Sequence, residues 1–259
     1  MRDAELLMMH VLGRDRAWIL AYWHDEIGID CSIPYHSAIE RRRNGEPMQY
    51  ITAEAEFYGL PFHVNRNVLI PRPETEHLVE KTIELAAGFA QPRIVDIGTG
   101  SGAIAIALAR KLPASRVAAV DLSAAALDVA KQNAERNGVA GRIRFIQGDL
   151  LAPVAGEQFE IVVSNPPYVS ETDRDSLAVE VRDYEPAQAL FAGEDGLAIY
   201  RRLIPDAFSA LVPAGAIALE IGYGQQAGVQ MLLQNAGFTQ IEFTSDLQGI
   251  PRVATARRG

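Results

Sequence analysis

The sequence predicts an α/β protein whose main part is a doubly wound, mostly parallel sheet. From Arg93 onward, apolar strand patterns alternate with helical patterns, as in a parallel sheet with helices on both faces. Three polar stretches, DIGTGSG, VDLS and SNPPY, each stand where a predicted strand ends. Ligands of such sheets bind beyond the carboxyl ends of the strands. The three stretches therefore predict one common site.

Two regions of different character precede the sheet. Residues 1 to about 45 are predicted to be helical, because apolar side chains recur at helical spacing: Ala4, Leu7, Met8 and Val11. From Tyr50 to Ile70 the pattern is strand-like, with a turn expected at Gly59-Leu60-Pro61. A helix is then expected to begin near Pro73, a residue that suits the first turn of a helix.

The α/β region is predicted element by element. Strands are expected at RIVDIG, RVAAVDLS, RIRFIQGDL, QFEIVVSNPPY (where the prolines stop the strand) and AIALEIG. Helices are expected at IAIALARKL, AAALDVAKQNAERNG, GLAIYRRLIPDAFSAL and 225–235, and a closing antiparallel hairpin at IEFTSDLQG and RVATARR. We therefore predict a helical domain over residues 1–48, a β-hairpin linker over 49–72 and an α/β domain over 73–259.

Composition narrows the class of protein. Cys31 is the only cysteine, which excludes an intrachain disulfide and any multi-cysteine metal site, and the five histidines lack metal-site spacing. The N-terminus is acidic where a secretory signal would be basic, and no apolar stretch reaches the length of a membrane span. The net charge of −9 argues against broad binding to a phosphate backbone, and the run Arg41–Arg43 is expected to be a solvated helix face. These features predict a cytoplasmic protein.

The glycine-rich stretch DIGTGSG is the first candidate binding motif. Gly98, Gly100 and Gly102 follow a strand and open a helix, so the backbone can turn tightly and a ligand can approach the helix N-terminus. The spacing differs from the dinucleotide pattern G-x-G-x-x-G. Asp121 ends the next strand, where a carboxylate can bind a ribose diol, although it could instead cap the following helix, a role for which Ser123 is better placed. The pattern predicts a nucleoside cofactor without naming it.

With SNPPY added, the chain resembles the S-adenosylmethionine-dependent methyltransferases. That family shares a D-x-G-x-G-x-G loop, an acidic residue ending the second strand, and NPPY after the fourth. The resemblance implies a Rossmann-like methyltransferase domain over residues 73–259, with S-adenosyl-L-methionine as cofactor and S-adenosyl-L-homocysteine as product. In the family NPPY accepts a planar nitrogen, either the exocyclic amine of adenine or the side-chain amide of glutamine.

The chemistry of NPPY agrees with that role. A conjugated NH2 group is a poor nucleophile because its lone pair is delocalised, and acceptors aimed at both hydrogens favour the pyramidal nitrogen that attacks a methyl group. Asn165 Oδ1 and the Pro166 carbonyl can be these acceptors, and adjacent prolines fix the backbone. Tyr168 offers a flat face for stacking. We expect Asn165, Pro166 and Tyr168 to be catalytic, and these three with Pro167 to bind the substrate.

A closer resemblance covers nearly the whole chain. The motifs GEPMQYITAEAEFYGLPFHVNRNVLIPRPETE, DIGTGSG, SNPPYVS, YEPAQALFAGEDGLAIYRRL and EIGYGQ resemble those of the release-factor glutamine N5-methyltransferases (HemK/PrmC). The resemblance implies that the substrate is the glutamine of the Gly-Gly-Gln loop of a peptide chain release factor, and that the helical domain helps to hold this factor. It also implies the cofactor-binding residues: Gly98, Thr99, Gly100, Ser101, Gly102, Asp121, Asp149, Leu150 and Asn165, with Arg72, Glu74 and Thr75 closing one wall.

The chain departs from this family at three places. Ala53 stands where the family usually has glycine, which bears on the local turn, and Leu150 stands where some relatives have an aromatic residue, so stacking on adenine is expected to be weaker. Relatives usually carry another helical stretch upstream, whereas Met1-Arg2 leads directly into DAELL. Glu220, which ends a strand, is expected either to face the cleft or to cap the next turn.

Other functions stay open at this stage. The same chemistry could act on a glutamine of a ribosomal protein, or NPPY could read adenine in DNA or RNA. The acidic composition and the lack of a basic, aromatic-rich recognition segment argue against nucleic acid. A non-catalytic nucleoside-binding module is a weaker alternative. We expect a release factor as partner, with no membrane and no direct nucleic-acid contact.

Overall fold

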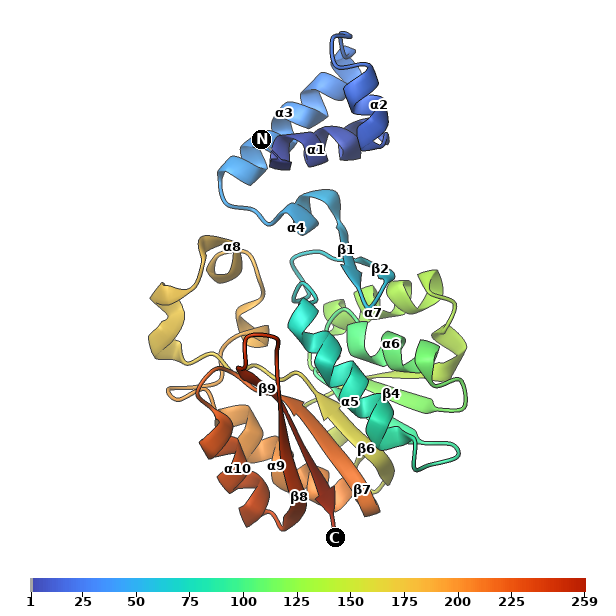
Figure 1. The fold of residues 1–259 in the computed structure, drawn as a ribbon, viewed down its shortest axis with the longest axis vertical. Coiled ribbons are helices and arrows are strands. Elements are labelled where there is room, and N and C mark those ends of the chain that lie inside the picture. Colours follow the sequence, from blue (N-terminus) through green and yellow to red (C-terminus); the bar gives the residue numbers. More distant parts are fainter. Residues whose placement is uncertain (1) are drawn as a thin grey trace.

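A seven-stranded sheet forms the centre of the computed structural model, which describes residues 2–259 (Figure 1). Its strands lie in the order β5-β4-β3-β6-β7-β9-β8. The strands β3 to β7 run parallel to their neighbours among themselves, and β9 pairs antiparallel with both β7 and β8. The strand bounds are β3 Arg93–Ile97, β4 Arg116–Asp121, β5 Ile143–Gln147, β6 Phe159–Ser164, β7 Leu211–Glu220, β8 Phe238–Ser245 and β9 Pro251–Arg258. The predicted fold class is confirmed.

The strand order reverses between β3 and β6. From β3 the chain moves outward to β4 and β5, and it then returns to place β6 and β7 on the other side of β3. The ends of β3 and β6 thus meet at the switch point where doubly wound sheets bind ligands. The predicted closing hairpin is confirmed, and β9 lies between β7 and β8 in the sheet.

Both faces of the sheet are buried. Along β3, Ile94 belongs to one apolar cluster and Val95 to the other, because successive side chains of a strand point to opposite faces. Helices α5, α6 and α7 cover the first face, and α9 and α10 cover the second. The helix bounds are α5 Glu76–Ala86, α6 Ala103–Lys111, α7 Ala124–Arg136, α8 Val179–Arg182, α9 Ala198–Ala210 and α10 Gln226–Asn235.

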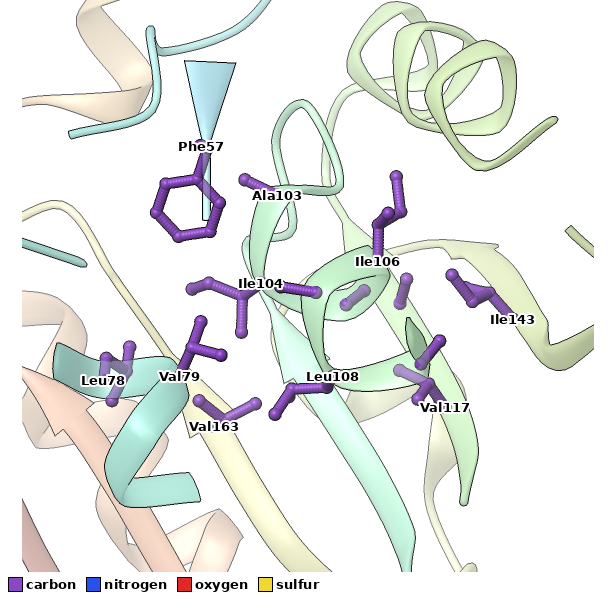
Figure 2. Close-up of a cluster of buried hydrophobic side chains, with 14 of the residues drawn as sticks. Phe57, Leu78, Val79, Ala103, Ile104, Ile106, Leu108, Val117, Ile143 and Val163 are labelled. Carbon is purple, nitrogen blue, oxygen red and sulfur yellow. The ribbon is translucent and has the colours of Figure 1, made fainter. Parts of the chain in front are cut away.

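Helix α6 lies at the centre of the first cluster (Figure 2). Ile104 and Ile106 project to opposite sides of the helix, and both are almost completely buried. Each such side chain stabilises the fold by about 1.5–3 kcal/mol. Phe57 of the hairpin joins this cluster, so the hairpin is packed onto the α/β part and holds the loop before α6.

A separate group of helices precedes the hairpin (Figure 1). These are α1 Arg2–Leu12, α2 Arg16–Ala21, α3 Ile29–Arg43 and α4 Met48–Thr52. Leu7, Ala38 and Ile51 form their small core. The prediction of helix over residues 1 to about 45 is confirmed for the described part, residues 2–45. None of the helices in residues 2–259 has the length and apolar composition needed to cross a bilayer.

The hairpin differs from its prediction in two ways. Its strands are β1 Glu54–Phe57 and β2 Leu60–His63, and Tyr50, expected in a strand, lies in α4. The turn is Tyr58-Gly59, both with positive φ, instead of the expected Gly59-Leu60-Pro61. A two-residue hairpin turn with positive φ at both positions cannot contain proline, whose φ is fixed near −65°. Pro61 is accommodated in the short edge strand β2.

The run Arg41–Arg43 was expected to be a solvated helix face, but two of its three arginines form ion pairs with other segments of the chain. Arg41 pairs with Glu46 at 2.8 Å, and Arg42 pairs with Asp3 at 2.7 Å and with Glu180 of α8 at 2.6 Å. Of the three, Arg43 best matches the predicted solvated face, with 77% of its side chain exposed. Arg42 therefore joins the helical region to the segment between β6 and α9.

Candidate active site

A cavity lies at the carboxyl ends of the central strands. Its wall is formed by loops that follow β3, β4, β5 and β6, together with two segments from outside the sheet. The lining residues are Asn67, Val68, Leu69, Ile97, Gly98, Gly100, Val120, Asp121, Leu122, Ala126, Gly148, Asp149, Leu150, Ser164, Asn165, Pro166, Pro167, Pro186, Gln188, Ala189 and Ile199. The three polar stretches predicted to form one site all contribute to it.

The glycine loop is shaped by its backbone conformation. Gly98, Gly100 and Gly102 have φ of +72°, +54° and +82°, a region that costs other residues about 1–2 kcal/mol each. A Cβ added at Gly98 or Gly100 would meet no atom within 4 Å, so conformation alone explains these two glycines. At Gly102 a Cβ would also approach Ile106 Cδ1 to 3.0 Å and Ala130 Cβ to 3.1 Å. Gly98 and Gly100 line the cavity, while Gly102 is the N-cap of α6.

Thr99 and Ser101 support the loop from behind. Thr99 Oγ1 donates a 2.6 Å hydrogen bond to Asp96, which is fully buried, and burial raises the pKa of Asp96 to about 7. The Ser101 carbonyl accepts a hydrogen bond of 2.9 Å from Asn133. Both side chains are buried, and neither they nor Gly102 line the cavity, although sequence analysis grouped all three with the binding residues.

Asp121 holds the loop and also faces the cavity. Its Oδ2 accepts a hydrogen bond of 2.8 Å from Gly100 N, and its Oδ1 accepts one of 2.9 Å from Ser123 N. The cap of α7 is Ser123, whose Oγ accepts from Ala126 N, so the alternative role of Asp121 as helix cap is excluded. Burial raises the pKa of Asp121, and the backbone hydrogen bonds oppose that shift. Each oxygen retains further acceptor capacity.

Part of the cavity lining is apolar. Leu122, Ala126 and Leu150 line the cavity beside Asp149, whose carboxylate pairs with Arg202. Leu150 adopts a positive φ of +49°. Leu122 was not predicted to belong to the site, although a large apolar residue directly after the acidic strand end is a usable signal. It is 59% exposed, and so has an apolar face available for contact.

The NPPY segment forms another part of the lining. Ser164 Oγ donates a 2.7 Å hydrogen bond to the Ile97 carbonyl and so fixes the end of β6 against the end of β3. Asn165, Pro166 and Pro167 line the cavity, whereas Tyr168 lies beyond the lining. The Tyr168 hydroxyl donates to Glu220 Oε1 at 3.3 Å, and its carbonyl accepts from Gln225 Nε2 at 2.8 Å.

Behind Asn165 lies a chain of hydrogen bonds. Asn165 Nδ2 donates to Thr75 Oγ1 at 3.1 Å, and Thr75 Oγ1 donates to Glu220 Oε2 at 2.6 Å. Glu220 is only 2% exposed, and this burial raises its pKa to about 7. Neither expectation for Glu220 holds: its carboxylate does not line the cavity, and it accepts from Thr75 and Tyr168 instead of capping the next turn.

The wall expected from Arg72, Glu74 and Thr75 is built differently. Arg72 pairs with the buried Glu185, and Thr75 lies behind Asn165. The cavity wall instead contains Asn67–Leu69, which follow the hairpin, and Pro186, Gln188 and Ala189, which lie between α8 and α9. Both segments fall within motifs that carry the family resemblance. The motifs did not indicate which of their residues would line the cavity.

Comparison with known proteins identifies the class. Residues 75–185 match the model of the methyltransferase small domain, and residues 1–52 match the model of the PrmC N-terminal domain. A methyltransferase structure from Pyrococcus furiosus has a TM-score of 0.56 at 18% identity, covering 86% of this chain and 98% of that one, which shows the shared fold. The fold and the site thus define a methyltransferase.

Full-length relatives define the family more closely. The release factor glutamine methyltransferase of Koribacter versatilis is 44% identical, covering 99% of this chain and 90% of the relative. That of Burkholderia pseudomallei is 40% identical, with coverage of 98% and 91%. The chain belongs to the release factor glutamine methyltransferase family.

Proposed function

We propose that the protein transfers a methyl group from S-adenosylmethionine to the side-chain amide nitrogen (N5) of the glutamine in the Gly-Gly-Gln loop of a peptide chain release factor. The observation that carries the proposal is the position of Asn165, which lines the cavity at the switch point and has its amide nitrogen held from behind by Thr75. S-adenosyl-L-homocysteine is the expected product, and the cytoplasm, where translation takes place, is the expected compartment.

The cavity carries groups that suit this cofactor. Asp121 presents a carboxylate with acceptor capacity for a ribose diol, and the positive-φ glycines bring the backbone to the cavity without side chains. Leu122, Ala126 and Leu150 offer apolar contact for a purine ring. When bound, S-adenosylmethionine supplies a methyl group whose bond to sulfur breaks as its bond to the glutamine nitrogen forms.

The residues of NPPY are proposed to prepare the nitrogen. Asn165 Oδ1 and the Pro166 carbonyl accept the two amide hydrogens, which draws the lone pair out of conjugation and holds it toward the methyl group. Tyr168 provides a flat face near the planar amide. The nitrogen loses one proton to solvent after attack, so the site needs no strong base.

The helical region over residues 1–48, followed by the hairpin linker over 49–72, is proposed to help hold the release factor. Support comes from the match to the PrmC N-terminal domain and from the full-length relatives. The contact between Arg42 and Glu180 supports a defined placement of these helices beside the α/β domain. The ribosomal-protein and adenine alternatives have no comparable support.

The test uses methyl-labelled S-adenosylmethionine with four acceptors: a release factor, its Gln→Ala loop variant, a ribosomal protein mixture free of release factors, and duplex DNA. Label on the wild-type factor alone is the expected result. Label on the loop variant would move the site away from that glutamine. Label on the ribosomal proteins or on DNA, without label on the release factor, would overturn the proposal in favour of that substrate.

A further inference from the structure

Asn165 can perform its proposed role in only one of two orientations of its side-chain amide. With Oδ1 toward the substrate it accepts a hydrogen from the planar NH2 group, whereas with Nδ2 there it would present a donor to a donor. The two orientations fill almost the same space. Packing therefore cannot select between them, and a hydrogen bond must.

The residue that contacts the amide is Thr75, which is 5% exposed. A threonine hydroxyl has one proton to donate, and here that proton goes to Glu220 Oε2 at 2.6 Å. Oγ1 can then act only as an acceptor toward Asn165. The amide atom beside it must be a donor, which places Nδ2 at Thr75 and leaves Oδ1 free. Among residues 2–259, no hydrogen bond occupies that Oδ1.

Glu220 is suited to set this direction. An ionised carboxylate only accepts hydrogen bonds, and Glu220 accepts from Thr75 on one oxygen and from Tyr168 on the other. The Tyr200 hydroxyl donates a hydrogen bond of 2.8 Å to the backbone carbonyl of Glu220, which anchors the end of β7. The carboxylate is thus held in place and supplied with donors from two sides.

We infer that Glu220 and Thr75 form a positioning relay that fixes the Asn165 amide with Oδ1 toward the substrate. The inference rests on the proposed function for the meaning of that orientation. Neither residue lines the cavity, so both act through Asn165 and not by touching the substrate.

The first test observes Asn165 in the free protein and needs no substrate. Protein labelled with ¹⁵N-asparagine gives side-chain NH2 signals, and the Asn165 pair is the one lost in Asn165→Asp. We expect the Nδ2 proton to exchange slowly with water in the wild type and in Thr75→Ser, which keeps the hydroxyl. In Thr75→Val its exchange should be faster by about tenfold, because its acceptor is gone.

Thr82, in the helix α5 that directly follows Thr75, provides a matched control substitution. Thr82 is fully buried and its hydroxyl donates to the Leu78 carbonyl at 2.7 Å, away from Asn165. Thr82→Val removes a buried hydroxyl and should leave the Asn165 signals unchanged. If Thr75→Val folds poorly because the buried Glu220 carboxylate loses one of its two donors, the double variant with Glu220→Gln removes that charge and is measured in the same way.

The second test is kinetic. Thr75→Val should lower kcat for the release factor by about 10- to 100-fold, with a smaller change in KM, while Thr75→Ser stays within about threefold of the wild type. If the Asn165 side-chain NH2 group has the same hydrogen-exchange rate and the same chemical shifts in Thr75→Val as in the wild type, the relay is overturned. This holds even if the wild type methylates the factor. Absence of methyl transfer by the wild type would instead count against the proposed function, and the NMR comparison would still decide the relay.

Discussion

Tyr168 and Glu220 are 52 positions apart in the chain, yet the Tyr168 hydroxyl donates a 3.3 Å hydrogen bond to Glu220 Oε1. The contact joins the last residue of NPPY to the last residue of β7. Since Glu220 also accepts from Thr75, one buried carboxylate connects the proposed stacking ring with the support of Asn165. The protonation state of Glu220 therefore bears on both.

Activity should depend on pH through Glu220. Burial raises its pKa to about 7 from 4.5; Thr75, Tyr168 and Arg252 oppose this shift, and the charge of Glu74 adds to it. The side chain is thus ionised above about pH 7 and protonated below. A protonated Glu220 can donate a hydrogen bond to Thr75, and the Thr75 hydroxyl can then donate to Asn165 instead of accepting from it. The Asn165 amide is then no longer fixed with Oδ1 toward the substrate, so kcat should fall as the pH drops through about 7.

Glu220→Gln tests that dependence. Glutamine can accept from Thr75 with its oxygen and donate to Tyr168 with its nitrogen, so activity at pH 8 should be within a few-fold of the wild type. The fall in kcat near pH 7 should weaken or disappear. Since Asp96 also has a pKa raised to about 7, Asp96→Asn is the comparison that separates the two groups. If kcat of Glu220→Gln falls below pH 7 as steeply as kcat of the wild type, the prediction is contradicted.

The same substitution should alter the pH dependence of stability. Because the folded pKa of Glu220 lies above its ordinary value, the folded protein binds more protons than the unfolded chain between about pH 4.5 and 7. The contribution of this group to stability therefore falls as the pH rises through that window and is constant above it. Urea unfolding across this range should show the wild type losing stability relative to Glu220→Gln.

Asn165→Ala should nearly abolish methyl transfer while leaving cofactor affinity largely intact. Loss of a single positioned polar group of this kind costs about 10²–10³-fold in kcat. Calorimetric titration with S-adenosylhomocysteine should give a dissociation constant within about threefold of the wild type. Asn235→Ala, an exposed site at the end of α10, is the control. Equal activity of Asn165→Ala would rule out the two-acceptor arrangement.

Asp121→Ala should act on the cofactor instead. Removing a charged acceptor for the ribose should weaken S-adenosylhomocysteine binding by about 10- to 100-fold. Asp128→Ala provides a matched aspartate control, because Asp128 lies on the exposed face of α7 and pairs only with Lys131 among residues 2–259. Thermal melting accompanies the titration, since Asp121 also braces Gly100. An unchanged dissociation constant would remove Asp121 from the site.

Ala53→Gly should stabilise the protein. Ala53 ends α4 in a left-handed conformation, with φ +58° and ψ +21°, where the Cβ is unfavourable. Relief of that conformation, less the entropy that glycine loses, predicts a gain of about 0.5–1 kcal/mol in the free energy of unfolding. Ala87→Gly, at an exposed right-handed position with φ −60°, should destabilise by a similar amount. A loss of stability in Ala53→Gly, measured by urea unfolding, would show that the methyl group contributes packing.

The alternation of strands and helices, the glycine loop and the polar strand ends could all be predicted from the sequence. These features are local: backbone periodicity, positive φ and the absence of a proline N–H act within a few residues, so they can be read along the chain. The turn at Tyr58-Gly59 shows the limit, because the sequence predicted Gly59-Leu60-Pro61, and the twist of the paired strands favours a two-residue turn with positive φ at both positions.

Which residues face the cavity and which support it depends on contacts between distant parts of the chain. Thr99, Ser101 and Thr75 are polar residues of the predicted motifs, but Thr99 and Ser101 are buried behind the glycine loop and Thr75 is buried behind Asn165. Glu220 acquires its role because β6 and β7 are neighbours and α5 packs across them, bringing Thr75 and Asn165 to it from 145 and 55 positions away. Burial and hydrogen-bond direction depend on these long-range neighbours, and no local pattern contains them.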